Sequence, residues 1–364
     1  MKSEVVEFLG AGKGNPRNSE GAFISLKNGN ILFVYTHYIG GVGDDCDVAV
    51  LAAIESSDQG RTWTPNDQKR IIMTSDDGNI YAGCKGNVMS VSLHRVENDE
   101  KIAMIYLRKR FIFENEKFCE YMPMISFSSD EGQTWSEPVS MNNNLPSITI
   151  ICNDRLIRLR SGRLIAPFSQ SFCGGGPGCV NIYYSDDEGK TWSVSPDTIL
   201  PPLHSQHGLH EPGVVELKDG RLLLWARSDM GYQYTSISED QGMTWSEAVP
   251  EKQFISPAAP LSCKRMPDGR LIAVWCDNDQ RWGIVSTRSG WEFGRTPFAA
   301  AFSDDDGVTW KDHILLETRP DHGYCYTAIH FTEDNGILLA YCCGGDSNNT
   351  WTLQDSCIRR LELD

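Results

Sequence analysis

The sequence lacks several features that would place it in common protein classes. No apolar run approaches the ~20 residues of a membrane-spanning helix, and the opening MKSEVVEFLG has no apolar core of a signal peptide. Basic residues are few: 33 lysines and arginines face 49 aspartates and glutamates, a formal net charge of −16. We therefore expect no nucleic-acid partner and no membrane span. The expected location is cytoplasmic, or secreted or periplasmic if an export signal has been removed.

Signals for metal and disulfide sites are also scarce. The 12 cysteines include no CxxC pair and no zinc-like spacing with histidine, and several lie in apparent strands, among them Cys263, Cys276 and Cys325. This favours buried thiols, with Cys173 and Cys179 around the loop GGGPG as the best disulfide candidates. The histidines of HSQHGLHE have no fixed geometry on a loop, and no helix pattern follows GGGPG to make a phosphate site. We predict no metal and no cofactor.

Helical periodicity, low-complexity segments and linkers are absent, and an eight-residue repeat is present instead. The pattern Ser-x-Asp-x-Gly-x-Thr-Trp, here called the Asp box, starts at Ser56, Ser128, Ser185, Ser238 and Ser303. Its glycine can take a positive φ, its Asp and hydroxyl side chains can bond the backbone of the turn, and its Trp can anchor the turn in a core. We therefore expect the aspartates of this repeated turn to have a structural role and not a catalytic one.

A second repeat alternates with the first. Asn-Gly, Asp-Gly and similar turns between apolar runs are strong hairpin signals. Six such turns precede apolar strands: Asn28-Gly29 before ILFVYT, Asn98-Asp99 before KIAMIYL, Ser161-Gly162 before RLIAPF, Asp219-Gly220 before RLLLWA, Asp268-Gly269 before RLIAVW, and Asn335-Gly336 before ILLAYC. The two repeats predict an all-β fold, a six-bladed β-propeller with Asp-box repeats. We expect one domain over residues 1–364, with the chain ends meeting in one blade.

The spacing of the turns predicts which residues share one end of the propeller. If the hairpin turn joins the first and second strands and the Asp box joins the third and fourth, both turns lie at one end. With strands of about six residues, residues about eight to eleven before a hairpin turn, about eight after it, or about eight before an Asp box lie at the other end. Those positions hold Arg17, Glu211, Arg227, Arg295 and Tyr326. Asp44, Asp45 and Asp47 lie at the same end, in the connection between the second and third strands of blade one, and the further candidates are Arg108, Asn153, Asp154, Arg155, Gln170 and Asp277.

The chemistry of this set is that of a site for an acidic sugar. Three converging guanidinium groups suit a carboxylate, because each offers a planar fork of donors, and such a cluster opposes the net charge of the chain. An aspartate on a Gly-rich loop can act as a general acid. A tyrosine beside a glutamate can be a nucleophile activated by a base, as in the glycosidases that use tyrosine.

The chain resembles the sialidase (neuraminidase) family of six-bladed Asp-box propellers. The Asp boxes carry the resemblance in fold, and three segments carry it in the site: GLHEPGVVELKDGRLLLWARS from Gly208, RTPFAAAFSDDDGVTW from Arg295, and YTAIHFTEDNGILLAY from Tyr326. The resemblance implies that Tyr326 is the nucleophile, Glu211 its base and Asp45 the acid/base. It also implies a clamp of Arg17, Arg227 and Arg295 around the substrate carboxylate.

Some positions differ from the family pattern and leave alternatives open. The family's Arg-Ile-Pro is Arg17-Asn18-Ser19 here, Cys342-Cys343 stands where the family has a Glu, and Thr36-His37-Tyr38 replaces another arginine. The expected partner is a glycan or glycoconjugate that ends in an acidic sugar, with sialic acid first and Kdn, Kdo or a uronate as alternatives. A lyase, in which His37 and His207 would matter, and a non-catalytic glycan-binding propeller are the other readings.

Overall fold

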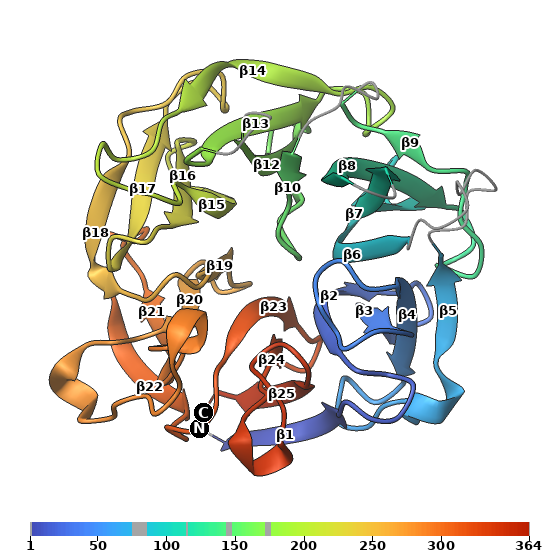
Figure 1. The fold of residues 1–364 in the computed structure, drawn as a ribbon. Helices are drawn as coiled ribbons and strands as arrows, with labels where there is room; N and C mark the ends of the chain where they lie inside the picture. The colour runs from blue at the N-terminus through green and yellow to red at the C-terminus, as the bar shows by residue number, and fades with distance from the viewer. Residues whose placement is uncertain (1, 75–85, 114–115, 143–147, 172–175, 364) are drawn as a thin grey trace.

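The strands are arranged in antiparallel blades around a central axis, which Figure 1 views end on. The computed structural model describes residues 2–74, 86–113, 116–142, 148–171 and 176–363. The strands therefore form the six-bladed β-propeller that the two repeats predict. Within the described ranges the only helices are four short 3-10 turns, η1 (Asn66–Gln68), η2 (Gln280–Trp282), η3 (Gly290–Glu292) and η4 (Asp346–Asn348). None of the described helices is long and apolar enough to cross a membrane.

The first three blades follow one another along the chain, each built outward from the axis. Single parallel bridges, Ala49 to Asn87 and Tyr121 to Ile148, join them into one continuous sheet. Blade one contains β2 (Asn18–Ser25), β3 (Ile31–Tyr38), β4 (Ala49–Ser56) and β5 (Arg70–Met73). Blade two contains β6 (Asn87–Val96), β7 (Lys101–Phe113), β8 (Glu116–Ser128) and β9 (Val139–Ser140). Blade three contains β10 (Ile148–Ile150), β11 (Ile157–Arg158), β12 (Leu164–Ser171), β13 (Cys179–Ser185) and β14 (Ser193–Ile199).

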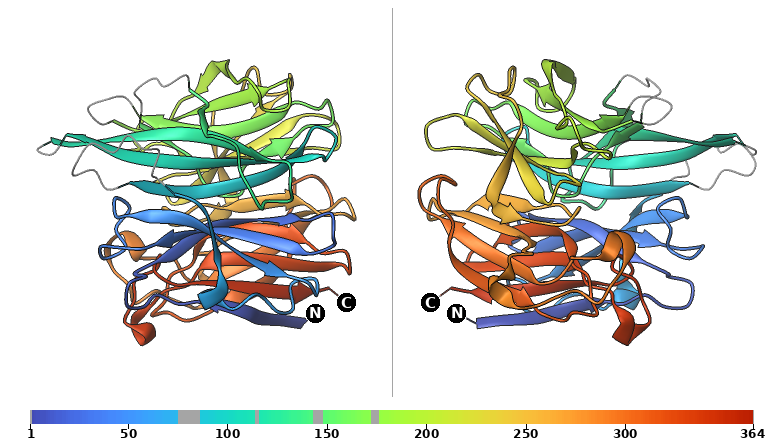
Figure 2. Two further views of the ribbon diagram at one scale, coloured as in Figure 1. Left: turned by 90° about the vertical axis from the view of Figure 1, so that its right-hand side faces the viewer. Right: turned by 60° about the vertical axis from the view of Figure 1, so that its left-hand side comes forward.

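The last three blades complete the ring, and the N-terminal strand closes it. Blade four contains β15 (His210–Glu216), β16 (Leu222–Arg227), β17 (Tyr232–Ser238) and β18 (Val249–Ile255). Blade five contains β19 (Ser262–Arg265), β20 (Leu271–Cys276), β21 (Phe298–Ser303) and β22 (Lys311–Glu317). Blade six contains β23 (Cys325–Phe331), β24 (Gly336–Cys342), β25 (Ser356–Glu362) and, as its outermost strand, β1 (Lys2–Leu9). Because β1 pairs with β25, the two ends of the chain lie together, as predicted (Figure 2).

Apolar side chains fill the spaces between neighbouring blades. One cluster joins blades five and six through residues such as Phe298 and Tyr341, and another joins blades six and one through Leu338 and Phe33. The strands read as nearly continuous apolar runs because both faces of a blade are covered by its neighbours. The ring is thus held by burial between blades, which leaves its axis available for polar side chains.

The five Asp boxes fold as the sequence predicts, with nearly identical hydrogen bonds. In the last of them, Ser303 Oγ accepts the N–H of Gly307 at 2.8 Å, and Asp305 Oδ1 accepts the N–H of Thr309 at 2.9 Å. The Thr309 hydroxyl donates to Asp305 Oδ2 at 2.6 Å. Gly307 has a φ of 85°, a conformation that favours glycine. The hydroxyl hydrogen bonds of Thr309 and Ser303 lower the pKa of Asp305 to about 2.

Replacing the Asp-box aspartate should reduce stability without involving the axis. We expect Asp305→Ala to lower the melting temperature by roughly 2–4 °C, because it leaves turn N–H groups without their acceptor. The matched control is the adjacent Asp304→Ala, which loses only an exposed ion pair with Lys311 and should shift it by less than about 1 °C. Thermal unfolding followed by circular dichroism measures both, and equal shifts would contradict a structural role for the Asp box.

The innermost strands of four blades share a β-bulge at the same position. In β2, β6, β15 and β23 the register with the second strand slips by one residue. The first residue within each slip has a positive φ: 50° at Glu20, 57° at Ser90, 50° at Glu211 and 60° at Tyr326. Such backbone is uncommon for residues other than glycine and concentrates at functional sites. A bulge also changes the direction of a side chain relative to the alternating pattern of a strand. Here the inner strands of four blades each contain such a bulge.

Candidate active site

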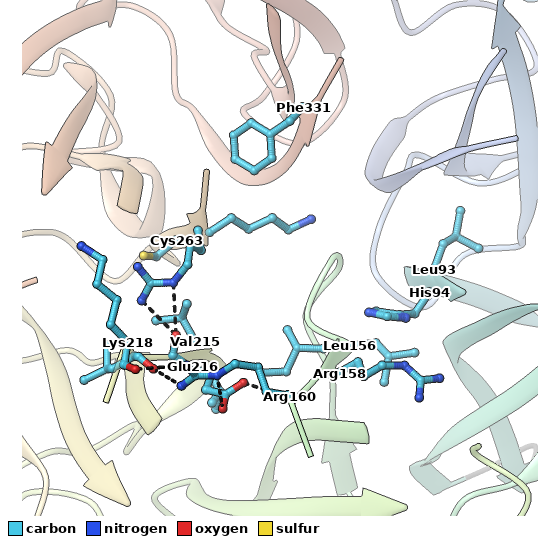
Figure 3. Close-up of a pocket in the computed structure, with 15 residues that line it drawn as sticks. Leu93, His94, Leu156, Arg158, Arg160, Val215, Glu216, Lys218, Cys263 and Phe331 are labelled. Carbon is cyan, nitrogen blue, oxygen red and sulfur yellow. Dashed lines mark hydrogen bonds and ion pairs between the residues drawn. The ribbon is translucent and has the colours of Figure 1, made fainter. Parts of the chain in front are cut away.

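Two cavities lie toward opposite ends of the propeller. One, of about 470 Å³, is lined where inner strands approach their hairpin turns, as at Glu216 and Lys218 (Figure 3). The other, of about 830 Å³, is lined by residues from the opposite ends of the strands, among them Asp45, Arg227 and Tyr326. The second cavity therefore contains five of the residues that the spacing of the turns assigned to one end, Asp44, Asp45, Arg227, Arg295 and Tyr326.

The smaller cavity is basic in composition, but its cations are paired. Figure 3 shows Arg160 bonded to Glu216, at 3.0 Å from Nε to Oε1. The other pairs are Arg158 with Glu188, Arg265 with Asp306 at 2.9 Å, and Lys264 with Asp154 at 2.7 Å. Lys264 and Arg265 thus lie at the end away from the larger cavity. These ion pairs neutralise the cations of the cavity, and those of Arg160 and Lys264 also join neighbouring segments of different blades, so we take the larger cavity as the candidate active site.

At the larger cavity, two of the bulges bring a tyrosine and a glutamate together. Tyr326 on β23 donates its hydroxyl proton to Oε1 of Glu211 on β15, with 2.6 Å between the oxygens. Arg227, the last residue of β16, places Nη1 2.9 Å from the other carboxylate oxygen of Glu211. Tyr326 and Glu211 are 8% and 6% exposed. Burial and the nearby Glu211 charge raise the pKa of Tyr326 well above its usual value, against the opposing effect of Arg227.

Two of the three predicted clamp arginines line this cavity. Arg227 has a side chain that is 20% exposed. Burial works to lower its pKa, but the charges of Glu211 and Tyr326 act against burial, and the pKa is raised. Arg295 precedes β21 and is held in place by the loops around it: Nη2 donates to the carbonyl of Ala258 at 3.0 Å, and Nη1 to the thiol of Cys325 at 2.9 Å. Its guanidinium also lies 5.0 Å from the ring centre of Trp291.

The third arginine, Arg17, is fully buried and forms an ion pair with Asp45. Nη1 lies 2.5 Å from Asp45 Oδ1, Nε donates to the hydroxyl of Ser19 at 3.0 Å, and the guanidinium lies 4.7 Å from the ring centre of Tyr38. Within the described residues, Nη2 of Arg17 has no hydrogen-bond partner. Desolvation works to raise the pKa of Asp45, but the charge and hydrogen bond of Arg17, together with the charge of Lys109, hold that pKa well below its usual range. Asp45 is therefore ionised in this state.

The loop that carries Asp45 is fixed by its neighbour Asp47. The carboxylate of Asp47 accepts backbone N–H groups from Val42, Gly43 and Asp44 at 2.8–3.0 Å. Gly41 has a φ of 73°, and a Cβ there would lie about 2.0 Å from the Asp47 carboxyl group, so the loop closes only around glycine. Asp44, a predicted substrate-binding residue, also lines the cavity. This Gly-rich loop thus holds its two other aspartates at the cavity.

A pair of tryptophans at the cavity was not predicted. Trp291, in the segment between β20 and β21, and Trp351, between β24 and β25, meet edge to face with ring centres 5.5 Å apart. Glu292 fixes this contact by accepting the backbone N–H of Thr352 at 2.7 Å. Trp291 remains 52% exposed. Both tryptophans lie outside the Asp boxes and outside the apolar strand runs. A tryptophan that belongs to neither repeat is the sequence signal that could have indicated them.

Residues 153–155 form hydrogen bonds with the inner strands of other blades or with the segments beside them. Asn153 Nδ2 donates to the backbone carbonyls of Gly21 and Tyr326 at 2.7 and 3.1 Å, so this side chain holds two of the bulges. Asp154 accepts the N–H of Ile329 at 2.8 Å as well as the ammonium of Lys264. Arg155 donates to the carbonyl of Leu261 at 2.8 Å. The structure therefore gives all three predicted sugar-binding side chains partners within the protein.

The other predicted substrate-binding residues differ in where they lie. His207 lines the cavity. His37 is buried against Asn18, where burial and Lys69 lower its pKa to about 4. Arg108 lines a separate cavity beside β5. Gln170 bonds Thr149, Tyr183 and Asn181 within blade three, and Asp277 accepts hydrogen bonds from Arg281 and Trp282.

Metal and disulfide chemistry gain no support from the described residues. Among them, no group of three or more His, Cys, Asp or Glu side chains is placed to hold a metal ion. Buried cysteines of the strands, such as Cys263, Cys276, Cys325 and Cys342, are free thiols. The Sγ of Cys179 lies 3.4 Å from the carbonyl of Gln170, and its candidate partner Cys173 lies outside the described residues.

Fold and cavity together define a six-bladed Asp-box propeller with an arginine-lined site at one end of its axis. The family described as a BNR repeat-like domain matches residues 89–339. The chain belongs to that family.

Known relatives of this chain include sialidases. The sialidase of Paraclostridium sordellii is 24% identical over 358 residues, which cover 88% of this chain and 80% of the relative. The sialidase of Clostridium perfringens is 25% identical over 360 residues, which cover 88% and 85%. Among solved structures, the Hadza microbial sialidase Hz136 superposes with a TM-score of 0.75 at 20% identity, covering 95% of this chain and 66% of that one. A likeness at this identity supports the fold alone.

Proposed function

We propose that the protein is an exo-acting glycoside hydrolase that releases a terminal acidic sugar, with sialic acid the first candidate. The observation that carries the proposal is the Tyr326–Glu211–Arg227 chain of contacts in a cavity that Arg295 and Asp45 also line. A buried tyrosine that donates to a carboxylate is the arrangement of a nucleophile and its base. The sialidase names of the relatives agree with it. The substrate would be a glycan or glycoconjugate with an acidic terminal residue.

The proposed reaction proceeds in two steps with net retention. In the first, the Tyr326 oxygen attacks the anomeric carbon while Glu211 takes the phenolic proton. The glycosidic bond breaks as Asp45 donates a proton to the leaving oxygen. In the second, Asp45 takes a proton from water as the water attacks the glycosyl-tyrosine, and Tyr326 leaves and recovers its proton from Glu211. The buried phenol needs Glu211, because its raised pKa keeps it protonated at neutral pH.

The ion pair between Arg17 and Asp45 suggests how the acid acquires its proton. In the free protein Arg17 holds Asp45 ionised, the wrong state for donating a proton. A substrate carboxylate that binds the guanidinium of Arg17 would compete with Asp45 for it. Asp45 would then lose its stabilising partner next to a second negative charge, and both changes raise the pKa of an acid. Binding of an acidic substrate would thereby prepare the acid.

A screen of methylumbelliferyl glycosides tests the proposal directly. We expect release of methylumbelliferone from the sialic acid derivative, with Kdn, Kdo and glucuronate derivatives as the alternative acidic sugars. A lyase would leave an unsaturated product that absorbs ultraviolet light, and a hydrolase would not. Binding of acidic glycans without turnover would instead indicate a non-catalytic glycan-binding propeller.

Removing the proposed acid should depend on the leaving group. We expect Asp45→Ala to retain most activity on aryl glycosides, whose leaving groups need little acid assistance, and to lose about 10²–10⁴-fold on natural glycosides. The ratio of kcat/KM between the two substrate types is the measurement. The matched control is Asp44→Ala, one residue earlier on the same loop, which should reduce both activities to a similar extent. An unchanged ratio for Asp45→Ala would remove it as the acid.

A further inference from the structure

Glu20 occupies the same structural position as the two proposed reactive residues. The register slips of β2, β15 and β23 occur at equivalent positions. In each strand, pairing with the second strand stops for two residues and resumes at a small residue, Ala22, Gly213 or Ala328. Glu20 therefore corresponds to Glu211 in blade four and to Tyr326 in blade six, with the same positive φ. A backbone conformation uncommon for glutamate is held in blade one by the same device that aims the reactive side chains.

The surroundings of Glu20 are polar, buried and charged on several sides. Its side chain is 4% exposed, with Oε1 3.7 Å from Nη2 of Arg17. Ser90, the bulge residue of β6, places its hydroxyl 3.4 Å from Oε2. The ionisable groups whose charges act on Glu20 come from several elements around it: Arg17, Tyr38 and Asp45 from blade one, Lys109 from β7, Cys152 from the segment after β10, Glu211 from β15 and Tyr326 from β23.

We propose that Glu20 is a specificity-determining residue that works as a neutral carboxylic acid beside Arg17, where it admits and hydrogen-bonds the substrate carboxylate. This inference rests on the proposed function, because it concerns the acidic group of the same substrate. An ionised Glu20 would compete for Arg17 and repel the incoming carboxylate. A protonated Glu20 leaves the guanidinium available and adds an O–H donor.

The contacts in the free protein agree with a neutral Glu20. The 3.7 Å separation from Arg17 is too long for a hydrogen bond, whereas Arg17 holds the exposed Asp45 at 2.5 Å. Burial raises the pKa of Glu20 to about 7, and the charges of Asp45 and Glu211 add to this against the opposing effect of Arg17 and Lys109. A bound carboxylate would be a further negative charge and would raise the pKa again.

Thermal stability tests the protonation state without any ligand. Because the pKa is raised from its ordinary 4.5 to about 7 on folding, the folded protein binds more protons between those values, and stability falls as pH rises through that window. Glu20→Gln mimics the protonated acid and removes this loss. We expect its melting temperature to match that of the wild type at pH 5 and to exceed it by a few degrees at pH 8.

Ligand binding then tests the role in the site. The probe is N-acetylneuraminate, measured by calorimetry from pH 6 to 8.5, with its methyl ester as the neutral comparison. For the wild type we expect the affinity for the acid to fall about thirtyfold over this range as Glu20 ionises. For Glu20→Gln we expect a fall of less than about threefold. His207, which also lines the cavity, is present in both proteins, so its contribution cancels in the comparison.

Glu7→Gln is the matched control. Glu7 lies on β1, the outermost strand of blade six, and burial raises its pKa as well. Its substitution should therefore also raise stability at high pH, but it should leave the pH dependence of ligand binding as in the wild type. The control separates the general effect of removing a buried carboxyl group from an effect at the site.

Each outcome decides the proposal. A Glu20→Gln protein that is less stable than the wild type at pH 8, or that binds the acid more weakly at every pH, would make Glu20 an ionised structural partner of Arg17 and overturn the proposal whatever the enzyme's substrate. A different outcome is that the melting temperatures of Glu20→Gln and the wild type diverge as pH rises while the wild type binds neither N-acetylneuraminate nor any other acidic sugar of the screen. In that case the proposed function fails. The ligand role of Glu20 then fails with it, although its protonation stands.

Discussion

Tyr326→Phe should abolish turnover on every substrate of the enzyme. The substitution removes the oxygen that we propose forms the covalent bond, and we expect kcat to fall by at least about 10³-fold on activated and natural glycosides alike. The protein should still fold and bind ligand, because the phenyl ring keeps the packing of β23 and only the 2.6 Å hydrogen bond to Glu211 is lost. Steady-state kinetics with the aryl glycoside and ligand binding by calorimetry provide the two measurements.

Tyr324→Phe is the control for this experiment. Tyr324 is also buried and lies two residues earlier, but it packs against Phe298 away from the cavity lining. We expect its activity to stay within about threefold of the wild type. Near-normal turnover by Tyr326→Phe on the true substrate would remove the tyrosine mechanism from consideration, while leaving the fold and the family unaffected.

The fold could be predicted from the sequence because its signals are local. Each Asp box makes its hydrogen bonds within eight residues, as between Ser303 and Thr309, and each hairpin turn is followed directly by its strand. Counting residues from these turns also brought Asp45, Arg227, Arg295 and Tyr326 to one cavity. Strand length and turn position are enough for that result, because a propeller repeats one unit around one axis.

Glu20 shows why the rest of the candidate site could not be predicted in this way. It lies eight residues before Asn28, as Glu211 lies eight before Asp219, but it was not among the residues predicted from the sequence. A regular strand alternates its side chains, however, and the bulge at Ser19–Ala22 adds a residue that only the register reveals. The spacing of Glu20 is therefore compatible with the site, but spacing does not show where the side chain points.

Contacts between distant loops were equally hidden. Trp291 and Trp351 meet because Glu292 bonds Thr352 from another blade, and nothing in either segment predicts that pairing. The same holds for Arg17. Its position in the sequence indicates the correct end of the propeller but not that Asp45 pairs with it and that it is fully buried. Long-range ion pairs of this kind depend on the assembled ring.

Removing the guanidinium group of Arg227 should strongly reduce kcat/KM, because this group is proposed to bind the substrate carboxylate in the transition state. Each charge-assisted hydrogen bond to a carboxylate is worth roughly 1.5–3 kcal/mol, so we expect Arg227→Ala to reduce kcat/KM by about ten- to a hundredfold or more. It also leaves the buried Glu211 without its 2.9 Å partner, which adds to the loss through the base. Arg227→Lys should recover only part of the activity, since an ammonium group cannot bond a carboxylate with two parallel donors.

Arg295→Ala makes an informative comparison, because the two arginines differ in what else they hold. The guanidinium of Arg295 bonds the carbonyl of Ala258 and the thiol of Cys325, whereas within the described part of the chain Arg227 forms an ion pair with Glu211. We therefore expect Arg295→Ala to lower both kcat/KM and the melting temperature, and Arg227→Lys to lower kcat/KM with little effect on the melting temperature.

A neutral substrate analogue separates the two roles of Arg227 further. If these arginines bind the substrate carboxylate, the weak turnover of the neutral analogue should be nearly unchanged by Arg227→Lys. An equal loss on acidic and neutral substrates would show that Arg227 serves the geometry of Glu211 rather than the carboxylate.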